Sequence, residues 1–133
     1  MAMEYVHHRL VKPEDWPWYN FTPAEMACPH CFKLLIEPDL MDQLQAARLI
    51  YGAPISIASA YRCLIHNRTV GGADDSAHPR GTAVDPKDPE TGAARRKLLN
   101  AFIAAGFAGI GMGAHKLHFD VDLLGPRAWH YGA

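Results

Sequence analysis

The sequence predicts an α+β fold with a small, mostly antiparallel sheet flanked by helices. Two segments carry apolar residues at helical spacing, early and in the middle of the chain, and several shorter segments alternate apolar and polar residues as strands do. Turn residues separate these strands. With 133 residues the chain suits one hydrophobic core, so we expect a single domain over residues 1–133. Within it, residues 1–20 form an N-terminal extension and residues 21–133 the core of the domain.

The first helix is expected to begin in the sequence FTPAEM. Thr22 is suited to the N-cap, Pro23 to the first helical position, and Glu25 to closing a capping box. Phe21 and Met26 can pack together across this helix start.

A longer helix follows in the sequence EPDLMDQLQAARLIYG. Leu40, Leu44, Ala47 and Tyr51 share one face at helical spacing. Gly52 is a suitable terminator, because glycine readily adopts the left-handed conformation found after helices.

The middle of the chain alternates between strand and loop. The sequence PISIASAYR predicts a strand with Ile55 and Ile57 on one face. Residues 63–81 are polar and rich in Gly, Asp and His, which predicts a long loop with at most one helical turn. A loop of this length in a compact domain usually has a function. The sequence TAVDPK, which follows, predicts a short strand.

The clearest helix lies in the sequence PETGAARRKLLNAFIAAGF. Leu98, Phe102 and Ala105 form its buried side, and Gly106 ends it. Two strands of a hairpin follow, in AGIGMG and KLHFDVDL. The second alternates two sets of residues, an apolar set on one face (Leu117, Phe119, Val121) and a polar set on the other (His118, Asp120, Asp122). The tail PRAWHYGA is expected to be irregular but packed against the domain through its aromatic residues.

Composition excludes several function classes. A formal net charge of −1 provides no basic field for nucleic acid or an anionic membrane. No apolar run reaches the length of about 18 residues that a membrane span needs. The N-terminus has no hydrophobic region of the kind that secretory signals carry, so we expect a protein made in the cytoplasm without a signal peptide. Three cysteines form no disulfide framework, which favours folding in a reducing compartment.

Eight histidines direct attention to a metal site. His78, Asp85 and His118 supply two imidazoles and one carboxylate, a ligand set typical of catalytic zinc with one coordination position left for water. Gly81 allows the chain between the first two residues to turn sharply. Such an ion would polarise a carbonyl group and lower the pKa of a bound water.

The sequence SAHPRGTAVD matches the pattern S-x-H-x-x-G-x-A-x-D, and in this the chain resembles the M15 zinc peptidases, D-alanyl-D-alanine carboxypeptidase-like enzymes that cut peptidoglycan stem peptides. Further blocks resemble the same family in the same order: FTPAEMACPHC, ISIASAYRC, and the closing GFAGIGM, LHFDVD and PRAW. Together they cover roughly residues 20–130. The resemblance implies a hedgehog-like and D-Ala-D-Ala peptidase-like zinc fold, with a catalytic core over residues 21–133.

The resemblance also implies roles for individual residues. It identifies His78, Asp85 and His118 as ligands of one Zn²⁺ per chain. Arg62 corresponds to an arginine that receives a substrate carboxylate or carbonyl, and Ser76 to a serine beside the substrate. A structural salt bridge is the alternative role for the arginine, and capping of the loop is the alternative for the serine.

The general base departs from the family pattern. Many relatives carry Glu or Asp three residues before the last ligand, where this chain has His115. Others use a histidine two residues before it, where this chain has Lys116. His115 can accept a proton near neutral pH. Asp120 is the second candidate, either as the base or as a carboxylate that orients an imidazole.

The implied function is zinc-dependent hydrolysis of peptide bonds in peptidoglycan stem peptides or cross-links. A phage endolysin or another cell wall hydrolase fits this reading, with the stem peptide as partner, a monomeric protein, and action on the bacterial wall after release or delivery. A non-catalytic zinc-binding module of the same fold and a D-Ala-D-Ala dipeptidase are the alternatives. Cys28 and Cys31 lie in the sequence CPHC, half of a zinc knuckle. Cys63 or His66 could complete a metal site with them, but packing is their expected role.

Overall fold

The computed structural model describes residues 2–121 and 125–131. The chain forms a five-stranded sheet in the order β3-β4-β6-β5-β7 and a separate two-stranded sheet, β1-β2. The larger sheet contains β3 (Ile57–Ser59), β4 (Ala83–Pro86), β5 (Gly109–Met112), β6 (Leu117–Asp120) and β7 (Arg127–His130). The smaller one contains β1 (Met3–Tyr5) and β2 (Leu34–Ile36). The helices are α1 (Pro23–Met26), α2 (Pro38–Tyr51), α3 (Leu64–Thr69) and α4 (Gly92–Ala104), with 3₁₀ turns η1 (His8–Leu10), η2 (Pro13–Asp15) and η3 (His78–Arg80).

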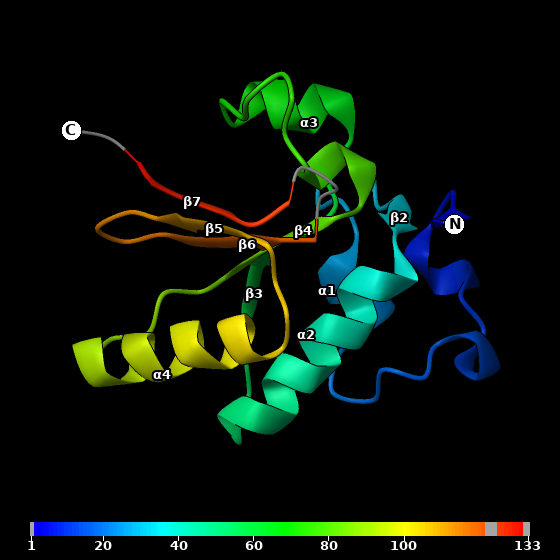
Figure 1. Cartoon of the computed structure of the whole chain (residues 1–133). Helices are drawn as coiled ribbons and strands as arrows, with labels where there is room; N and C mark the ends of the chain where they lie inside the picture. The colour runs from blue at the N-terminus through cyan, green and yellow to red at the C-terminus, as the bar shows by residue number, and fades with distance from the viewer. Residues whose placement is uncertain (1, 122–124, 132–133) are drawn as a thin grey trace.

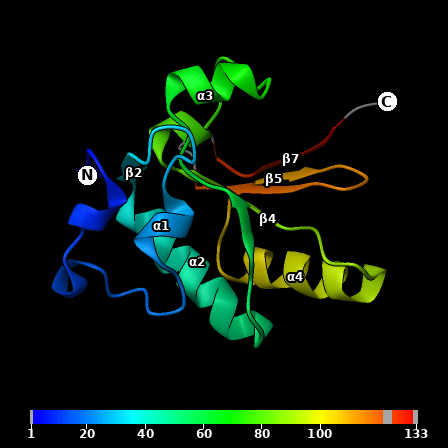
Figure 2. The ribbon, with the colours of Figure 1, turned by 180° about the vertical axis from the view of Figure 1, so that it is seen from behind.

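Helices cover the larger sheet unequally. Figures 1 and 2 show α2 and α4 together on one side of the strands, and α3 on the other side. The pairs β3–β4, β4–β6 and β5–β6 are antiparallel, and only β5–β7 is parallel among the described strands. The expected α+β class with a small, mostly antiparallel sheet is confirmed.

Capping side chains and a left-handed glycine mark the helix ends that the sequence predicts. Thr22 and Glu25 form a reciprocal capping box at α1, with the Thr22 amide donating to Glu25 Oε1 at 3.1 Å and the Glu25 amide donating to Thr22 Oγ1 at 3.3 Å. Helix α2 ends at Gly52, whose φ of 76° is left-handed. Thr91 caps α4 by accepting from the Ala94 amide at 3.1 Å.

The core lies between the helices and the sheet. Phe102 of α4 stacks on Phe119 of β6 with ring centroids 4.0 Å apart, and both side chains are fully buried. Leu117, on the same face of β6, is also buried. The apolar face predicted for this strand therefore packs toward α4, and the alternating residues project to the opposite face.

Two segments are more regular than the sequence analysis expected. The polar stretch after Cys63 contains the six-residue helix α3, because the Cys63 thiol caps it by accepting the His66 amide at 3.4 Å. The tail forms β7, which extends the sheet beside β5, and the amide of Tyr131 continues this pairing by donating to the Met112 carbonyl at 2.8 Å. Neither segment carries a strong apolar period: α3 begins at a local side-chain cap, whereas β7 depends on its pairing with β5.

Over the described part of the chain, no helix combines the length and the apolar composition that crossing a membrane would require.

Candidate metal centre

Three residues expected to bind metal converge on one face of the sheet. His78 lies in η3, Asp85 in β4 and His118 in the neighbouring antiparallel strand β6. One potential ligand atom from each lies within 4.8 Å of the other two, and all three side chains are buried. Asp85 Oδ1 is 3.1 Å from His78 Nε2 and 2.8 Å from His118 Nδ1. The structure thus brings together residues that lie far apart in the sequence.

A glycine turn places His78 opposite the strand that carries Asp85. Gly81 ends η3 with a φ of 72°, and its amide donates to the His78 carbonyl at 3.1 Å. A Cβ atom at this position would meet the Leu35 carbonyl oxygen at 2.5 Å. Glycine is therefore required both for the left-handed backbone and for the close approach to the segment around β2.

The remaining polar atoms of both imidazoles are held by neighbouring groups. His78 Nδ1 lies 2.6 Å from the Ala60 carbonyl oxygen, which can only accept, so this nitrogen carries the proton and Nε2 faces Asp85. His118 Nε2 lies 2.9 Å from Asp120 Oδ2, which leaves Nδ1 for the centre. Metal-binding histidines characteristically have such a partner on the ring nitrogen that does not bind the ion.

This donor set fits a zinc ion. Ligand atoms at about 2.0–2.2 Å from a tetrahedral ion lie about 3.3–3.6 Å from one another. The observed separations of 2.8 and 3.1 Å from Asp85 Oδ1 need only a small expansion to match. The residues also supply the nitrogen and oxygen donors that zinc prefers. The expected ligand set is chemically complete, with a fourth position for water or substrate.

Hydrogen bonds within the site shift the pKa values of Asp85 and His118. Burial alone would raise the pKa of Asp85, but hydrogen bonds to His118 and His78 lower this pKa well below its usual range. Burial alone would lower the pKa of His118, but hydrogen bonds to Asp120 and Asp85 raise it above its usual value. The carboxylate therefore stays ionised, and the imidazole retains its proton to a higher pH than a free histidine would.

Asp120, one of the two candidate bases, is buried beneath His118. Its two carboxylate oxygens accept a bidentate pair of hydrogen bonds from Arg127, from Nη1 at 3.1 Å and from Nη2 at 2.9 Å. Gly109 faces the carboxylate across the β5–β6 pair, where a Cβ atom would lie 2.2 Å from Asp120 Oδ1. Arg127 and Gly109 were missed by the sequence analysis, although the GIG and PRAW blocks contain them.

Arg62, the expected substrate-binding arginine, lies beside the ligand Asp85. Its Nη2 donates to Asp85 Oδ2 at 3.2 Å, its Nε donates to Ser59 Oγ at 2.9 Å, and its Nη1 donates to Asn67 Oδ1 at 3.0 Å. Arg62 is 7% exposed and still lines a pocket. The guanidinium group thus combines the salt-bridge role with access to that pocket.

That pocket, of about 510 Å³, opens onto the centre. Ser76, His78, His118 and Asp120 line it. The Ser76 hydroxyl accepts the His78 amide at 3.2 Å, so it also caps the turn that carries this ligand. Among the remaining lining residues are three from the C-terminal segment (Arg127, Trp129, Tyr131). The Trp129 ring lies 5.4 Å from the His118 ring, between centroids.

His115, the other candidate base, lies in the turn between β5 and β6. Its side chain is exposed, and it lines a second pocket together with Asp85, Lys116 and Leu117. The polar face predicted for β6 is buried at His118 and Asp120, and is not solvated. Asp122, the third residue predicted on that face, lies outside the described residues.

Comparison with known proteins adds one positive finding. A family model described as Peptidase M15 matches residues 19–122, well over half of the chain. The matched range includes all three converging residues and both candidate bases. No curated protein matches the sequence.

Proposed function

This chain belongs to the peptidase M15 family, and from that premise we propose that it is a zinc metallopeptidase that hydrolyses peptide bonds in the stem peptides or cross-links of peptidoglycan. The observation that carries the proposal is the convergence of His78, Asp85 and His118, each with its other polar atom held by a neighbour. When bound, a zinc ion would supply Lewis acidity toward the scissile carbonyl and lower the pKa of a water molecule.

Arg62 has two tasks in this proposal. Its bond to Asp85 Oδ2 holds the carboxylate so that Oδ1 points toward the two imidazoles. A guanidinium group carries five N–H donors, and three acceptors engage Arg62 within the protein. The donors that remain can bind a carboxylate or carbonyl of a stem peptide that enters the pocket lined by Arg62 and Ser76.

His115 is the residue that we assign to proton transfer. Asp120 is 1% exposed, and Arg127 and His118 engage its carboxylate, so we assign it to positioning the imidazole. His115 is exposed and lines the second pocket, which shares Asp85 with the centre, so in this proposal its side chain reaches the attacking water from that side. A neutral imidazole there can accept a proton from the attacking water and deliver it to the leaving amine.

The biological role proposed is that of a phage endolysin or related cell wall hydrolase acting on the bacterial wall. Stem peptides contain D-residues and free carboxylates, which a pocket with an arginine can bind. A D-Ala-D-Ala dipeptidase uses the same chemistry on a free dipeptide, and the experiment below separates the two by product.

The test is mass spectrometry of fragments released from purified peptidoglycan and from defined muropeptides. Wild-type protein is expected to release fragments whose new ends identify the bond that is cut. A chelator should abolish release, and added zinc should restore it. His118→Ala should be inactive, whereas the exposed His130→Ala serves as a matched control with full activity.

A second set of variants assigns the base. His115→Ala should lower kcat at least about 100-fold while zinc content stays unchanged, the loss that removal of a general base produces. An unchanged kcat would refute the assignment of His115. Zinc-loaded protein that releases neither amines nor fragments from any wall type would refute the peptidase, in favour of a non-catalytic zinc module.

A further inference from the structure

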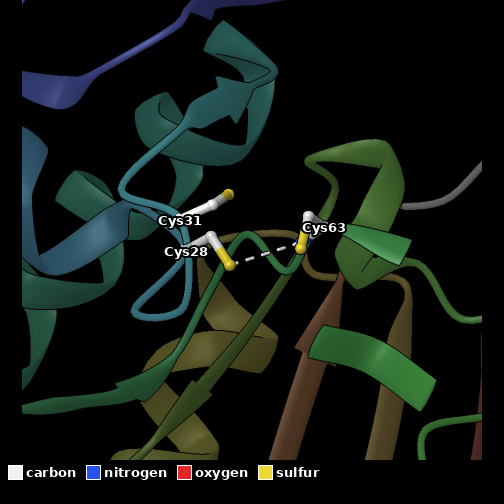
Figure 3. A group of neighbouring side chains, drawn as sticks. All are labelled: Cys28, Cys31 and Cys63. Carbon is white, nitrogen blue, oxygen red and sulfur yellow. Dashed lines mark hydrogen bonds between the residues drawn. The ribbon is translucent and has the colours of Figure 1, made fainter. Parts of the chain in front are cut away.

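A second cluster of metal-binding side chains lies apart from the centre described above. The sulfur atoms of Cys28, Cys31 and Cys63 all lie within 4.8 Å of one another. Figure 3 shows Cys28 and Cys31 on one turn of the chain and Cys63 on the segment that faces it. We propose that these three thiolates, with His30 as the fourth ligand, bind a structural zinc ion. This site is independent of the peptidase proposal and raises the expected content to two ions per chain.

Packing alone does not account for the cluster. Cys28 is buried, as a packing cysteine would be, but Cys63 is half-buried and Cys31 is exposed. A structural zinc site of the Cys₃His type uses four protein ligands and commonly takes two of them from a C-x-x-C turn. The CPHC sequence provides such a turn, and Cys63 supplies the third thiol from a distant segment.

Two backbone hydrogen bonds close the turn that carries Cys28 and Cys31. The Phe32 amide donates to the Cys28 carbonyl at 2.8 Å, and the Cys28 amide donates to the Lys33 carbonyl at 2.9 Å. Phe32, directly after Cys31, has a φ of 65°, the one non-glycine residue with a left-handed backbone among those described. That conformation is disfavoured for a bulky side chain, so the surrounding contacts must hold it. The closed turn keeps both of its cysteines next to Cys63.

Backbone amides point at two of the sulfur atoms. The Cys63 amide donates to Cys28 Sγ at 3.5 Å, and the His66 amide donates to Cys63 Sγ at 3.4 Å. The second bond lies at the start of α3. Each bond fixes the position of a sulfur atom relative to the backbone, as the neighbours of metal ligands do.

His30 is the fourth ligand that we assign, and its ring would turn toward Cys28 and Cys31 on binding, because the group of mutually close ligand atoms contains the three sulfur atoms only. Its Nδ1 lies 3.7 Å from Cys63 Sγ. A sulfur and a nitrogen bound to one tetrahedral zinc, at about 2.3 and 2.05 Å, lie about 3.6 Å apart. The His66 ring lies nearly parallel to the His30 ring, with centroids 5.9 Å apart, and we assign it to packing against the ligand.

An ion here would fasten the N-terminal segment to the active region. Cys63 directly follows Arg62, whose guanidinium group holds Asp85. The Tyr61 amide already donates to the Met26 carbonyl at 3.1 Å, so the two segments lie side by side. Four bonds to one ion would fix the start of α3 against the CPHC turn.

The experiment measures metal on the full chain purified under reducing conditions with zinc present. Wild-type protein should hold two zinc ions. His78→Ala/His118→Ala should hold one, and Cys28→Ser/Cys63→Ser should also hold one. Cobalt(II) provides a second reading, because thiolate ligands give it an intense charge-transfer band in the near ultraviolet. The band should persist in the histidine double variant and be lost in the cysteine double variant.

Matched histidine variants test the fourth ligand. His30→Ala should alter the visible cobalt spectrum and weaken zinc binding at least about tenfold, whereas His66→Ala should leave the spectrum unchanged. Wild-type protein that holds one zinc ion and shows no charge-transfer band would overturn the proposal. A count of reactive thiols in the denatured protein gives a further check. If this count is lower by two than the number of cysteines, and neither zinc nor a chelator changes it, two cysteines form a disulfide and the proposal is overturned. Neither reading depends on peptidase activity.

Discussion

Asp120 is a buried carboxylate that orients the imidazole of the proposed metal ligand His118 without binding the metal itself. It accepts from His118 on one side and from the fork of Arg127 on the other. An aspartate two residues after a histidine on a strand shares its face, so the sequence could place Asp120 near the centre. It could not reveal the partner, because Arg127 reaches Asp120 only through the parallel pairing of β7 with β5.

Asp120→Asn should therefore weaken zinc binding. The amide can still accept one hydrogen bond, but it loses the charge that holds both His118 and Arg127. We expect zinc affinity to fall about 10–100-fold, as when such outer partners of a zinc ligand are removed. Competition with a chromophoric chelator measures the change. Glu14→Gln, on the exposed turn η2, is the control, and equal affinities for the three proteins would contradict a positioning role.

The raised pKa of His118 predicts a pH dependence of zinc binding. Binding requires the neutral imidazole, and in the metal-free protein Asp120 and Asp85 keep the proton on His118 to a higher pH. Apparent zinc affinity should therefore be full well above the raised pKa and fall as the pH decreases through it, with the fall beginning above the value of about 6.5 expected for a free histidine. Titrations across this range check the prediction. An affinity independent of pH would contradict it.

At the scale of elements, segments with a clear apolar period could be predicted from the sequence, whereas segments without such a period could not. Helices α2 and α4 and strand β6 carry clear apolar periods, and each forms where the sequence analysis placed it. Helix α3 and strand β7 lack such a period: α3 begins at the local Cys63 cap, and β7 forms by pairing with the edge of β5. The connection that the sequence did anticipate is the glycine turn at Gly81.

Gly81→Ala tests whether this turn is required by close packing or only by its backbone conformation. Gly81 and Gly52 have nearly equal φ values, 72° and 76°. A Cβ atom at Gly52 meets nothing within 4 Å, whereas one at Gly81 meets the Leu35 carbonyl oxygen at 2.5 Å. Gly52→Ala should lower the free energy of unfolding by about 1 kcal/mol, and Gly81→Ala by about 2–4 kcal/mol. Urea denaturation measures both, and equal losses would show that the contact with Leu35 is relieved at no cost.

At the scale of the whole molecule, the N-terminal segment is built into the fold. Strand β1 pairs with β2 in the register Met3↔Ile36, and Trp18 belongs to the core cluster with 6% of its surface exposed. The Trp18 indole N–H donates to Asp42 Oδ1 on α2 at 2.8 Å. Residues 1–20 were expected to form an extension, and the blocks that resemble the M15 peptidases begin only near residue 20. The pairing partner of this segment, β2, lies about thirty residues away, beyond the reach of local patterns.

Adjacent aromatic residues in this segment provide the sharpest test of its role. Trp18 is buried, whereas its neighbour Tyr19 is 74% exposed. Trp18→Ala leaves a cavity beside α2, so we expect the free energy of unfolding to fall by about 3–5 kcal/mol. Tyr19→Ala should change it by no more than about 0.5 kcal/mol. Urea denaturation followed by circular dichroism, with zinc held constant, measures the difference between the two variants. Equal stabilities would mean that residues 1–20 are dispensable, as an extension would be, and that the core beginning at residue 21 is sufficient for folding.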